Sequence, residues 1–312
     1  MKVCYFIQTH KNSEQIYRLV RTIKTSSPDS LVIISHDFSG CKLEPSSLDD
    51  LQGIKIIPSK GGRGSFSIIQ AYLAAIEWLL QNNINFDWFI NISGQDYPIQ
   101  PISEIEYFLD KTSYDGFIEY FKVFSQDSHW SIYEGSNRHL YNYKILVDNL
   151  PNWQQQALKP LKIINLIQPL FRINLSYGLR IGFKRQNPFT KEFICYGGSY
   201  FCTLSRQCIE YLHDFCHNNQ EIIDYYKGVL NPDESFIQTI LINSDSFSLY
   251  NDCKRYFDFS RTNNSHPAIL TTNDYKSLIK SEAHFARKFD MNIDNQVLDI
   301  LEQAISRRKI LT

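Results

Sequence analysis

Three short stretches in the last third of the chain hold residue types that could carry out group transfer to a hydroxyl. They are Gly197 to Phe201, Asn231 to Phe236 and His284 to Asp290. The first offers a tight glycine turn, the second a carboxylate at a predicted helix start, and the third a basic pair between phenylalanines. Together, these parts could deprotonate a hydroxyl and hold an anionic leaving group.

Glu234 is the strongest candidate for a general base. Asn231 at the N-cap, Pro232 at the first helical position and Glu234 at the third predict a helix start. The same pattern has a purely structural interpretation, in which Glu234 only completes a capping box. The side chains of Asp233 and Glu234 diverge because they are adjacent on a helix, which argues against a glycosidase with two carboxyl groups facing a common centre.

Arg287 and Lys288 are candidates for neutralising a leaving group such as a nucleoside diphosphate. Its developing charge must be met by a metal ion or by fixed cations. The chain contains no Asp-x-Asp triplet, the usual acidic handle for a divalent metal. A lysine held by Phe285 and Phe289 could replace the metal as a point charge, so we expect no metal and no other cofactor. The alternative is a surface basic pair beside an aromatic anchor.

Two glycine-rich turns give weaker signals. Gly61 to Ser65 could cradle phosphate at a helix start, but it matches neither the P-loop nor the dinucleotide fingerprint and could equally be a plain turn. Gly197 and Gly198 could let an acceptor approach the backbone, or could only form the turn before a strand over 200–204. The eight histidines show no HExxH or other ligand spacing, so we assign them no metal role.

Apolar runs and helical spacing alternate through the first third of the chain. They predict helices that begin near Asn12 and extend over 66–81, and strands over 2–9, 31–34, 54–57 and 87–92. This alternation indicates an open, largely parallel α/β sheet, in which ligands bind outside the carboxyl ends of the strands. His36-Asp37 and Gln95-Asp96 follow two of these strands, so we expect both pairs near a ligand.

The composition limits the class of protein. The 312 residues are 43% hydrophobic with a net charge of −1, which indicates a folded protein that binds no nucleic acid through a broad basic surface. Seven cysteines without a CxxC pair favour free thiols in a reducing compartment. A strand is predicted almost from Met1 and no apolar run is long enough to cross a membrane, so we expect a cytoplasmic protein without a signal peptide.

The segment 159–191 carries seven basic and no acidic residues, interleaved with Ile, Leu and Phe. A basic amphipathic stretch can lie on an anionic membrane, which would place the protein peripherally at the inner face of the membrane. The alternative, which we favour, is a solvated helix and loop that cover the acceptor side.

Taken in order, the segments resemble the family of core-2/I-branching β-1,6-N-acetylglucosaminyltransferases and peptide O-xylosyltransferases (glycosyltransferase family 14), in a bacterial-type form. The similarity covers most of the chain and is carried by Tyr5 to Asn12, Ser35 to Asp37, Ile90 to Pro98, Gly197 to Arg206, Pro232 to Leu241, Arg255 to Ser260 and Phe285 to Asp290. It implies a GT-A-like glycosyltransferase fold, with a Rossmann-like, mostly parallel central sheet flanked by helices. It also implies one catalytic domain over 1–312, with a nucleotide-binding half over 1–112 and an acceptor-binding and catalytic half over 113–312.

The resemblance also implies roles for individual residues. Glu234 matches the family's catalytic base and Lys288 its diphosphate ligand, in a reaction that inverts the anomeric centre without a metal. Asp37 is expected near the uridine of a UDP-sugar donor, and Asp96 in the same pocket. On the acceptor side, the expected contacts come from the glycine turn, at Gly198, Ser199 and Tyr200.

The chain also departs from the family pattern. Phe259 stands where the family often has Trp, which keeps a stacking surface but loses the indole donor. Where the branching enzymes have a second basic residue, this chain reads Asn264 to Pro267, so Arg261 or Arg287 is expected to stand in. Xylosyl members carry an acidic residue at the position of Tyr200. We expect this chain to have neither the Golgi anchor nor the disulfides of the animal relatives.

These patterns lead to one hypothesis and one alternative. The hypothesis is transfer of N-acetylglucosamine or xylose from a UDP-sugar to a hydroxyl on a glycan, a glycolipid or a polymer precursor. The alternative is a catalytically silent UDP-sugar- or glycan-binding module of the same fold.

Overall fold

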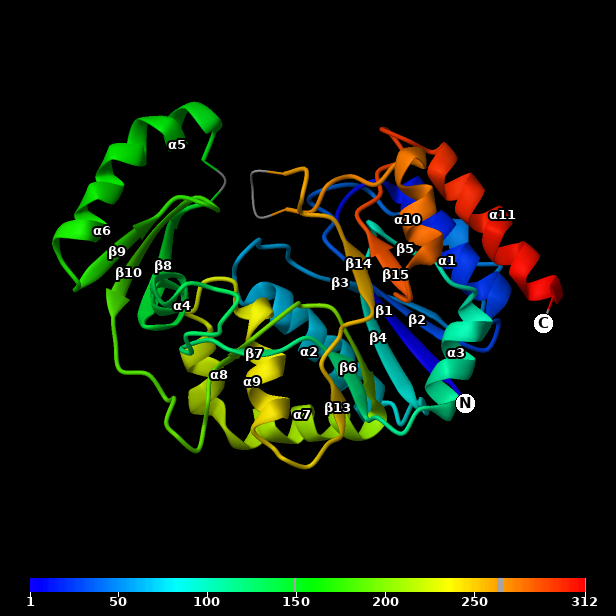
Figure 1. Cartoon of the computed structure of the whole chain (residues 1–312), viewed down its shortest axis with the longest axis horizontal. Helices are drawn as coiled ribbons and strands as arrows, with labels where there is room; N and C mark the ends of the chain where they lie inside the picture. The colour runs from blue at the N-terminus through cyan, green and yellow to red at the C-terminus, as the bar shows by residue number, and fades with distance from the viewer. Residues whose placement is uncertain (149, 263–265, 312) are drawn as a thin grey trace.

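A seven-stranded sheet forms the centre of the molecule (Figure 1). The structure is a computed structural model that describes residues 1–148, 150–262 and 266–311. In spatial order the strands are β13 (Leu249–Tyr250), β6 (Gly116–Ile118), β12 (Cys202–Ser205), β4 (Trp88–Ser93), β1 (Val3–Thr9), β2 (Leu31–His36) and β3 (Ile54–Pro58). Neighbouring strands from β4 to β3 are parallel, as are β13 and β6, whereas β12 is antiparallel to both β4 and β6.

The four strands predicted in the first third of the chain are all present and parallel. They are the buried runs β1, β2 and β4 and the edge strand β3. Together with the flanking helices, they confirm the predicted α/β class with a mostly parallel central sheet. The sheet also contains β12, β6 and β13. Strand β12, which overlaps the strand expected over 200–204, pairs with β4 across more than a hundred residues of chain, β6 pairs with β12, and β13 pairs with β6. No local sequence pattern indicates these pairings.

Helices cover both faces of the sheet because alternate side chains of its strands point to opposite sides. Tyr5 and Ile7 lie in one hydrophobic core and Cys4 and Phe6 in the other. The first core is closed by α1 (Ser13–Ser26), α3 (Ile102–Lys111), α10 (Tyr275–Lys280) and α11 (Gln296–Leu311). The second is closed by α2 (Ser67–Gln81), α7 (Arg206–Asn218), α8 (Gln220–Tyr226) and α9 (Phe236–Ile242) (Figure 1).

Two small sheets lie beside the central one. The first has the order β14 (Arg255–Phe257), β15 (Phe285–Arg287) and β5 (Asp96–Pro98). Because β15 lies between the other two, it brings the basic pair 287–288 next to the segment that follows β4. The second pairs β7 (Phe121–Lys122) with β11 (Tyr196–Gly197) ahead of the glycine turn.

A third small sheet stands with short helices at one end of the molecule (Figure 1). Its strands have the order β8 (Tyr141–Val147), β10 (Leu179–Lys184) and β9 (Phe171–Asn174). Helix α4 (Ile132–His139) precedes β8. Between β8 and β9 the chain forms α5 (Asn152–Leu158), the 3₁₀ turn η2 (Lys159–Ile163) and α6 (Ile164–Ile167). The segment 159–191 is therefore not one amphipathic helix. Of its basic residues, Arg172 donates to Asn137 Oδ1 at 3.0 Å, Arg180 donates to the Arg63 carbonyl at 2.8 Å, and Arg185 stacks 3.6 Å from the Tyr225 ring centroid.

All seven cysteines are free, as predicted from their number and spacing. Among the helices of the described ranges, none is both long enough and apolar enough to cross a membrane.

Candidate active site

Glu234 lies in a short 3₁₀ turn, η3 (Pro232–Glu234), that leads into α9. Asn231 precedes it in the left-handed backbone region with a φ of 50°, and its side chain makes no capping hydrogen bond. The Glu234 carboxylate is paired with Arg138 and not with the backbone. The capping-box interpretation of Glu234 is therefore wrong, and the predicted helix begins only at Phe236.

Helix α4 holds the segment around Glu234 through two consecutive residues. Arg138 donates from Nη1 to Glu234 Oε2 and from Nη2 to Glu134 Oε1 at 2.6 Å. Its guanidinium lies 4.0 Å from the centroid of the Trp130 ring, which fixes the guanidinium plane. His139 Nε2 lies 2.9 Å from Ser235 Oγ. Residues from two distant parts of the chain thus fix the position of the candidate base.

The Glu234 side chain remains accessible although it is paired. It is 37% exposed, against 13% for Arg138. Only Oε2 is bound to Arg138, and Oε1 has no hydrogen-bond partner among the described residues. This arrangement orients the carboxylate and leaves one oxygen free to accept a proton from an incoming hydroxyl.

The glycine turn after β11 packs directly against Glu234. Gly198 donates its N–H to the Glu234 carbonyl at 2.9 Å, and a Cβ at Gly198 would lie 1.9 Å from the Glu119 carbonyl oxygen. Ser199 follows, with its carbonyl accepting from Gln238 Nε2 at 2.6 Å. The structure therefore places Gly198 and Ser199 beside the candidate base, and glycine is required by this close approach of two backbones.

Tyr200, the third expected acceptor contact, points into the protein. It is 9% exposed, and its hydroxyl donates to Gln8 Oε1 at 2.6 Å at the carboxyl end of β1. Its side chain joins the glycine turn to the central sheet, which is a positioning role.

Asp233 faces the interior next to the candidate base. Its Oδ1 is buried without a hydrogen-bond partner among the described residues. Burial and the neighbouring Glu234 carboxylate raise the pKa of Asp233, while the charges of Arg138 and Arg287 act in the opposite direction. The influence of both arginines places Asp233 between the two parts of the site.

Lys288 follows directly on β15 and is half-buried. Burial lowers the pKa of Lys288, and the positive charges of Arg287, Arg63 and Lys11 lower it further. No described residue forms an ion pair with its ammonium. The charge of Asp290 acts in the opposite direction. Of these four cations, Arg287 pairs with Asp96 and Lys11 with Asp290, whereas Lys288 and Arg63 form no ion pair with a described residue. The cluster therefore keeps a net positive charge, which suits an anion.

Arg287 and Asp96 form a buried pair behind this cluster. Arg287 Nε lies 3.3 Å from Asp96 Oδ1, and the guanidinium lies 4.2 Å from the centroid of the Phe201 ring. Asp96 is 1% exposed and its Oδ2 accepts from the Ser93 N–H at 2.6 Å. Burial raises the pKa of Asp96, against the lowering effect of Arg287. Asp96 is thus near the predicted pocket, where it holds Arg287 in place.

Asp37 organises the glycine-rich loop after β3. Its Oδ1 accepts from the Ser39 N–H at 2.9 Å and the Ser39 hydroxyl at 2.7 Å, and its Oδ2 accepts from the Gly61 N–H at 2.8 Å. Burial tends to raise the pKa of Asp37, but these hydrogen bonds outweigh it and lower the pKa. The loop carries Arg63, so Asp37 contributes to the position of one of the four cations.

Phe259 and Arg261 lie on the loop after β14, next to the chain around Lys288. Phe259 is 52% exposed, and Arg261 pairs with Asp258 at 2.7 Å and Asp274 at 2.9 Å. Two carboxylates already compensate Arg261, whereas Arg287 adjoins Lys288 directly. Asn264 and Ser265, in the stretch where the branching enzymes have their second basic residue, lie outside the described residues.

The structure brings together most of the predicted site and adds residues that the sequence did not indicate. Arg138 and Gln15 are the main additions. Gln15 donates to the carbonyls of Gly94 at 2.8 Å and Phe289 at 3.1 Å, so it ties the segment after β4 to the segment after β15. Arg138 belongs to no recognisable motif, and the sequence indicates Gln15 only as part of the helix start at Asn12. Arg63 lies in the glycine-rich loop that the sequence predicts as a turn, but no sequence pattern indicated that it contributes to the site.

Comparisons with known proteins identify a family and several relatives. The family model described as Core-2/I-Branching enzyme matches residues 3–279. Beta-glucuronosyltransferase GlcAT14B of Arabidopsis thaliana is 24% identical over 303 residues, which cover 95% of this chain and 60% of that protein. Xylosyltransferase 2 of Rattus norvegicus is 26% identical over 260 residues, which cover 77% of this chain and 26% of that protein. The chain thus spans only part of the length of these relatives.

Among solved structures, the galactosyltransferase LgtC in complex with donor and acceptor sugar analogues covers 92% of this chain and 87% of its own. Its TM-score is 0.40 and its sequence identity 9%.

Proposed function

This chain belongs to the Core-2/I-Branching enzyme family, and we propose that it is an inverting glycosyltransferase that needs no metal for catalysis. Its donor is a UDP-sugar, and its acceptor is a hydroxyl on a glycan, a glycolipid or a polymer precursor. Glu234 is the general base and Lys288 the principal ligand of the UDP diphosphate. The observation that carries the proposal is a partly exposed, oriented carboxylate at Glu234, together with a cluster of four cations in which Lys288 forms no ion pair with a described residue.

In the proposed reaction, the acceptor hydroxyl attacks the anomeric carbon from the side opposite the diphosphate. Glu234 Oε1 takes the hydroxyl proton as the new carbon–oxygen bond forms. The bond from the anomeric carbon to the diphosphate oxygen breaks, and UDP leaves with the electron pair. Lys288 and Arg287 compensate the charge that develops on that oxygen, a task that a divalent metal fulfils in other transferases.

A few contacts between the sugar and its pocket determine which sugar is transferred. The family resemblance suggests N-acetylglucosamine or xylose. Because the names of two relatives specify glucuronic acid and xylose, UDP-glucuronic acid joins the donors to be tested.

A UDP-release assay in EDTA tests the proposal. We would screen UDP-N-acetylglucosamine, UDP-xylose, UDP-glucuronic acid, UDP-glucose and UDP-galactose, with slow hydrolysis as the readout. Turnover of one donor in the chelator is the expected result. Turnover that depends on added manganese would contradict the assignment of Lys288. Binding of UDP without turnover of any donor, even with acceptor glycans present, would favour the silent binding module.

We also propose that the end of the molecule formed by α5, η2 and α6 contacts an anionic membrane, because it exposes large apolar side chains. Their exposed fractions lie between 64% and 78%, and the residues are Trp153, Ile163, Leu166, Ile167 and Leu170. Lys159 and Lys162 are exposed among them. Buried apolar area combined with attraction to anionic lipid is the usual basis of interfacial binding.

Liposome flotation tests the membrane contact. We expect the protein to float with phosphatidylglycerol vesicles at low salt, less with phosphatidylcholine, and less after Leu166→Ser with Ile167→Ser. Ile293→Ser is the matched control, since Ile293 is 59% exposed but lies outside this surface. Failure to float at low salt would contradict the membrane contact and leave the proposed reaction unaffected.

A further inference from the structure

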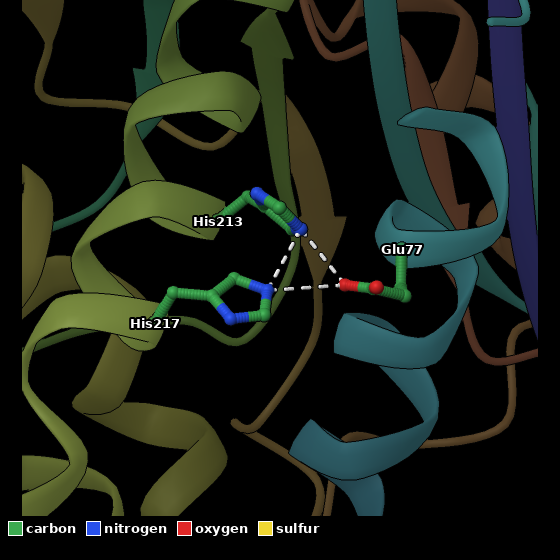
Figure 2. Close-up of side chains that lie close together, drawn as sticks. All are labelled: Glu77, His213 and His217. Atoms are coloured by element: carbon green, nitrogen blue, oxygen red, sulfur yellow. Dashed lines mark hydrogen bonds and ion pairs between the residues drawn. The ribbon is translucent and has the colours of Figure 1, made fainter. Parts of the chain in front are cut away.

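A cluster of three potential metal ligands lies between α2 and α7, outside the candidate active site (Figure 2). It consists of Glu77 on α2 and of His213 and His217 on α7. Glu77 Oε2 lies 2.8 Å from His213 Nε2 and 3.3 Å from His217 Nε2, and the two Nε2 atoms are 3.0 Å apart. Figure 2 shows the three side chains pointing at one another from the two helices.

The spacing in the sequence explains how the histidines meet. Residues four apart lie on the same face of a helix, one turn above the other, so His213 and His217 present their rings side by side. Their ring centroids are 4.3 Å apart. The packing of α2 against α7 then brings a carboxylate from a different element to the same point.

No placement of protons on the two histidines gives all three atoms of this triangle favourable hydrogen bonds. If both Nε2 atoms donate to Glu77 Oε2, two N–H groups lie against each other across 3.0 Å. If one nitrogen is left without a proton, it can accept from the other histidine but makes no favourable contact with the carboxylate. A cation at the centre removes the conflict, because three lone pairs can then point at one positive charge.

The dimensions of the triangle fit zinc. With zinc–ligand distances of about 2.0–2.1 Å in tetrahedral geometry, the ligand atoms would lie roughly 3.3 Å apart. The observed separations are 2.8, 3.0 and 3.3 Å, so only small side-chain rotations are needed. Two imidazoles and one carboxylate are also a donor set that zinc accepts, with a fourth position left for water.

Outer contacts orient two of the three ligands. His213 Nδ1 lies 3.3 Å from Asp214 Oδ1, which favours the tautomer with a proton on Nδ1 and a free lone pair on Nε2. Gln81 donates to Glu77 Oε1 and leaves Oε2 for the cluster. Support of this kind is typical of metal-binding histidines and carboxylates.

We propose that Glu77, His213 and His217 form a zinc-binding site that joins α2 to α7. Helix α2 begins near the glycine-rich loop of the active site, and Glu77 lies ten residues, or about 15 Å, further along it. The site is therefore separate from the chemistry at Glu234. It is compatible with the proposed catalysis without metal.

Zinc titration of the tag-free protein tests this site. We expect one zinc ion per chain by calorimetry and a higher melting temperature with zinc. His217→Asn should weaken binding at least tenfold, and His213→Asn with His217→Asn should abolish it. Glu77→Gln, which keeps a side chain of the same shape, should also weaken it. His129→Asn is the control, because His129 is exposed and lies in the loop before α4.

Zinc binding that is unchanged in the double histidine variant, or absent from the unaltered protein, would overturn the proposal. Cobalt gives a second readout, since a tetrahedral site produces intense visible absorption that the double variant should lose. The UDP affinity of each variant shows that it is folded. The UDP-release assay with and without EDTA should be repeated on the double variant. If EDTA lowers the activity of the unaltered protein but not that of the double variant, the metal that EDTA removes is the one at this site and not a catalytic metal.

Discussion

At the scale of single residues, the environment of Glu234 determines how it can act. Arg138 binds one carboxylate oxygen and is itself held by Glu134 and by the face of Trp130. A base must present a defined lone pair to the attacking hydroxyl, and this network fixes the direction of the free oxygen. The network also explains why the segment does not form the capping box that its sequence suggests.

Glu234→Gln should lower the turnover rate by roughly 10²- to 10⁴-fold, the usual effect of removing a general base. The amide keeps the shape of the side chain but cannot take the proton. The affinity for UDP should stay nearly constant, because in the proposed reaction Glu234 acts on the acceptor hydroxyl and not on UDP. Steady-state turnover and UDP titration measure the two effects. Glu134→Gln is the matched control, since it removes the other partner of Arg138 but no proposed proton acceptor; equal losses in both variants would contradict the assignment.

Lys288→Gln should weaken UDP binding by roughly 10- to 100-fold, which corresponds to about 1.5–3 kcal/mol for a charged hydrogen bond. The affinity for uridine, which lacks the diphosphate, should hardly change. Lys11→Gln provides the comparison, because Lys11 belongs to the same cluster but is compensated by Asp290 at 3.2 Å. Calorimetry with UDP and with uridine would measure both. A loss of uridine affinity as large as that for UDP would argue against a diphosphate contact.

At the scale of elements, the active site depends on the close approach of the glycine turn to η3. Gly198→Ala places a methyl group 1.9 Å from the Glu119 carbonyl oxygen, so one of the two backbones must move. We expect a loss of about 1–3 kcal/mol in the free energy of unfolding and a fall in turnover, because Gly198 also binds the Glu234 carbonyl. Urea unfolding and the UDP-release assay measure these changes.

Gly116→Ala is the control for that substitution. The new methyl group would lie 2.8 Å from two leucine side chains, Leu204 and Leu249, which can adjust, and 3.5 Å from the nearest backbone atom. Both substitutions replace glycine by alanine, so they lower the conformational entropy of the unfolded chain by the same amount. A destabilisation at Gly116 as large as that at Gly198 would show that the backbone contact is not the cause.

The local elements were predictable and the long-range contacts were not. Buried runs of β-forming residues marked β1, β2 and β4, and a helical stripe marked α2, because these patterns depend on neighbours in the sequence. The antiparallel β12 and the Arg138–Glu234 pair depend on contacts across about a hundred residues, for which one sequence has no periodic signal. No metal role was assigned to the histidines from the sequence, because the four-residue spacing of His213 and His217 was overlooked, and Glu77 on another helix has no sequence signal.

The residues of the candidate site were indicated mainly by the resemblance of their motifs to a family, and less by the chemistry of the individual side chains. The motifs indicated Glu234, Lys288 and Arg287, and the structure shows Glu234 paired with Arg138 and Arg287 paired with Asp96 beside Lys288. Their roles in catalysis and donor binding stay predictions. Asp37 and Asp96 are predicted to line the donor pocket. In the structure, Asp37 accepts hydrogen bonds from Ser39 and Gly61, and Asp96 accepts one from the Ser93 N–H and pairs with Arg287. A residue at a strand end can therefore belong to a site by holding another residue in place, a role that a motif does not distinguish from binding.

At the scale of the whole molecule, two buried histidines connect stability to pH. His139 and His284 are 0% and 5% exposed, and burial lowers the pKa of each to about 3. The positive charge of Arg138 lowers the pKa of His139 further, and that of Arg255 does so for His284. His139 Nδ1 faces the Gly135 carbonyl, which can only accept, so the neutral ring carries its proton there and Nε2 accepts from Ser235.

The sign of the effect follows from these pKa values. In the unfolded chain a histidine has a pKa of about 6.5, so between about pH 6.5 and pH 3 the unfolded state binds protons that the native state does not. The stability due to each neutral histidine is therefore complete above about pH 6.5 and is lost as the pH falls toward 3. Each histidine contributes up to about 1.4 kcal/mol per pH unit to the slope. The raised pKa of Asp233 acts in the opposite direction over part of this range.

Urea unfolding at several pH values between 7 and 4 would measure this slope. We expect His139→Gln to be less stable at pH 7, because it loses the ring packing, but to depend less on pH, by about 1.4 kcal/mol per pH unit in the steepest region. His129→Gln should leave the slope unchanged, since His129 is exposed. A slope that is identical in the unaltered protein and in His139→Gln would mean that His139 takes up its proton in the folded state. The contact between α4 and the segment of the candidate base would then hold a charged ring and not a neutral one.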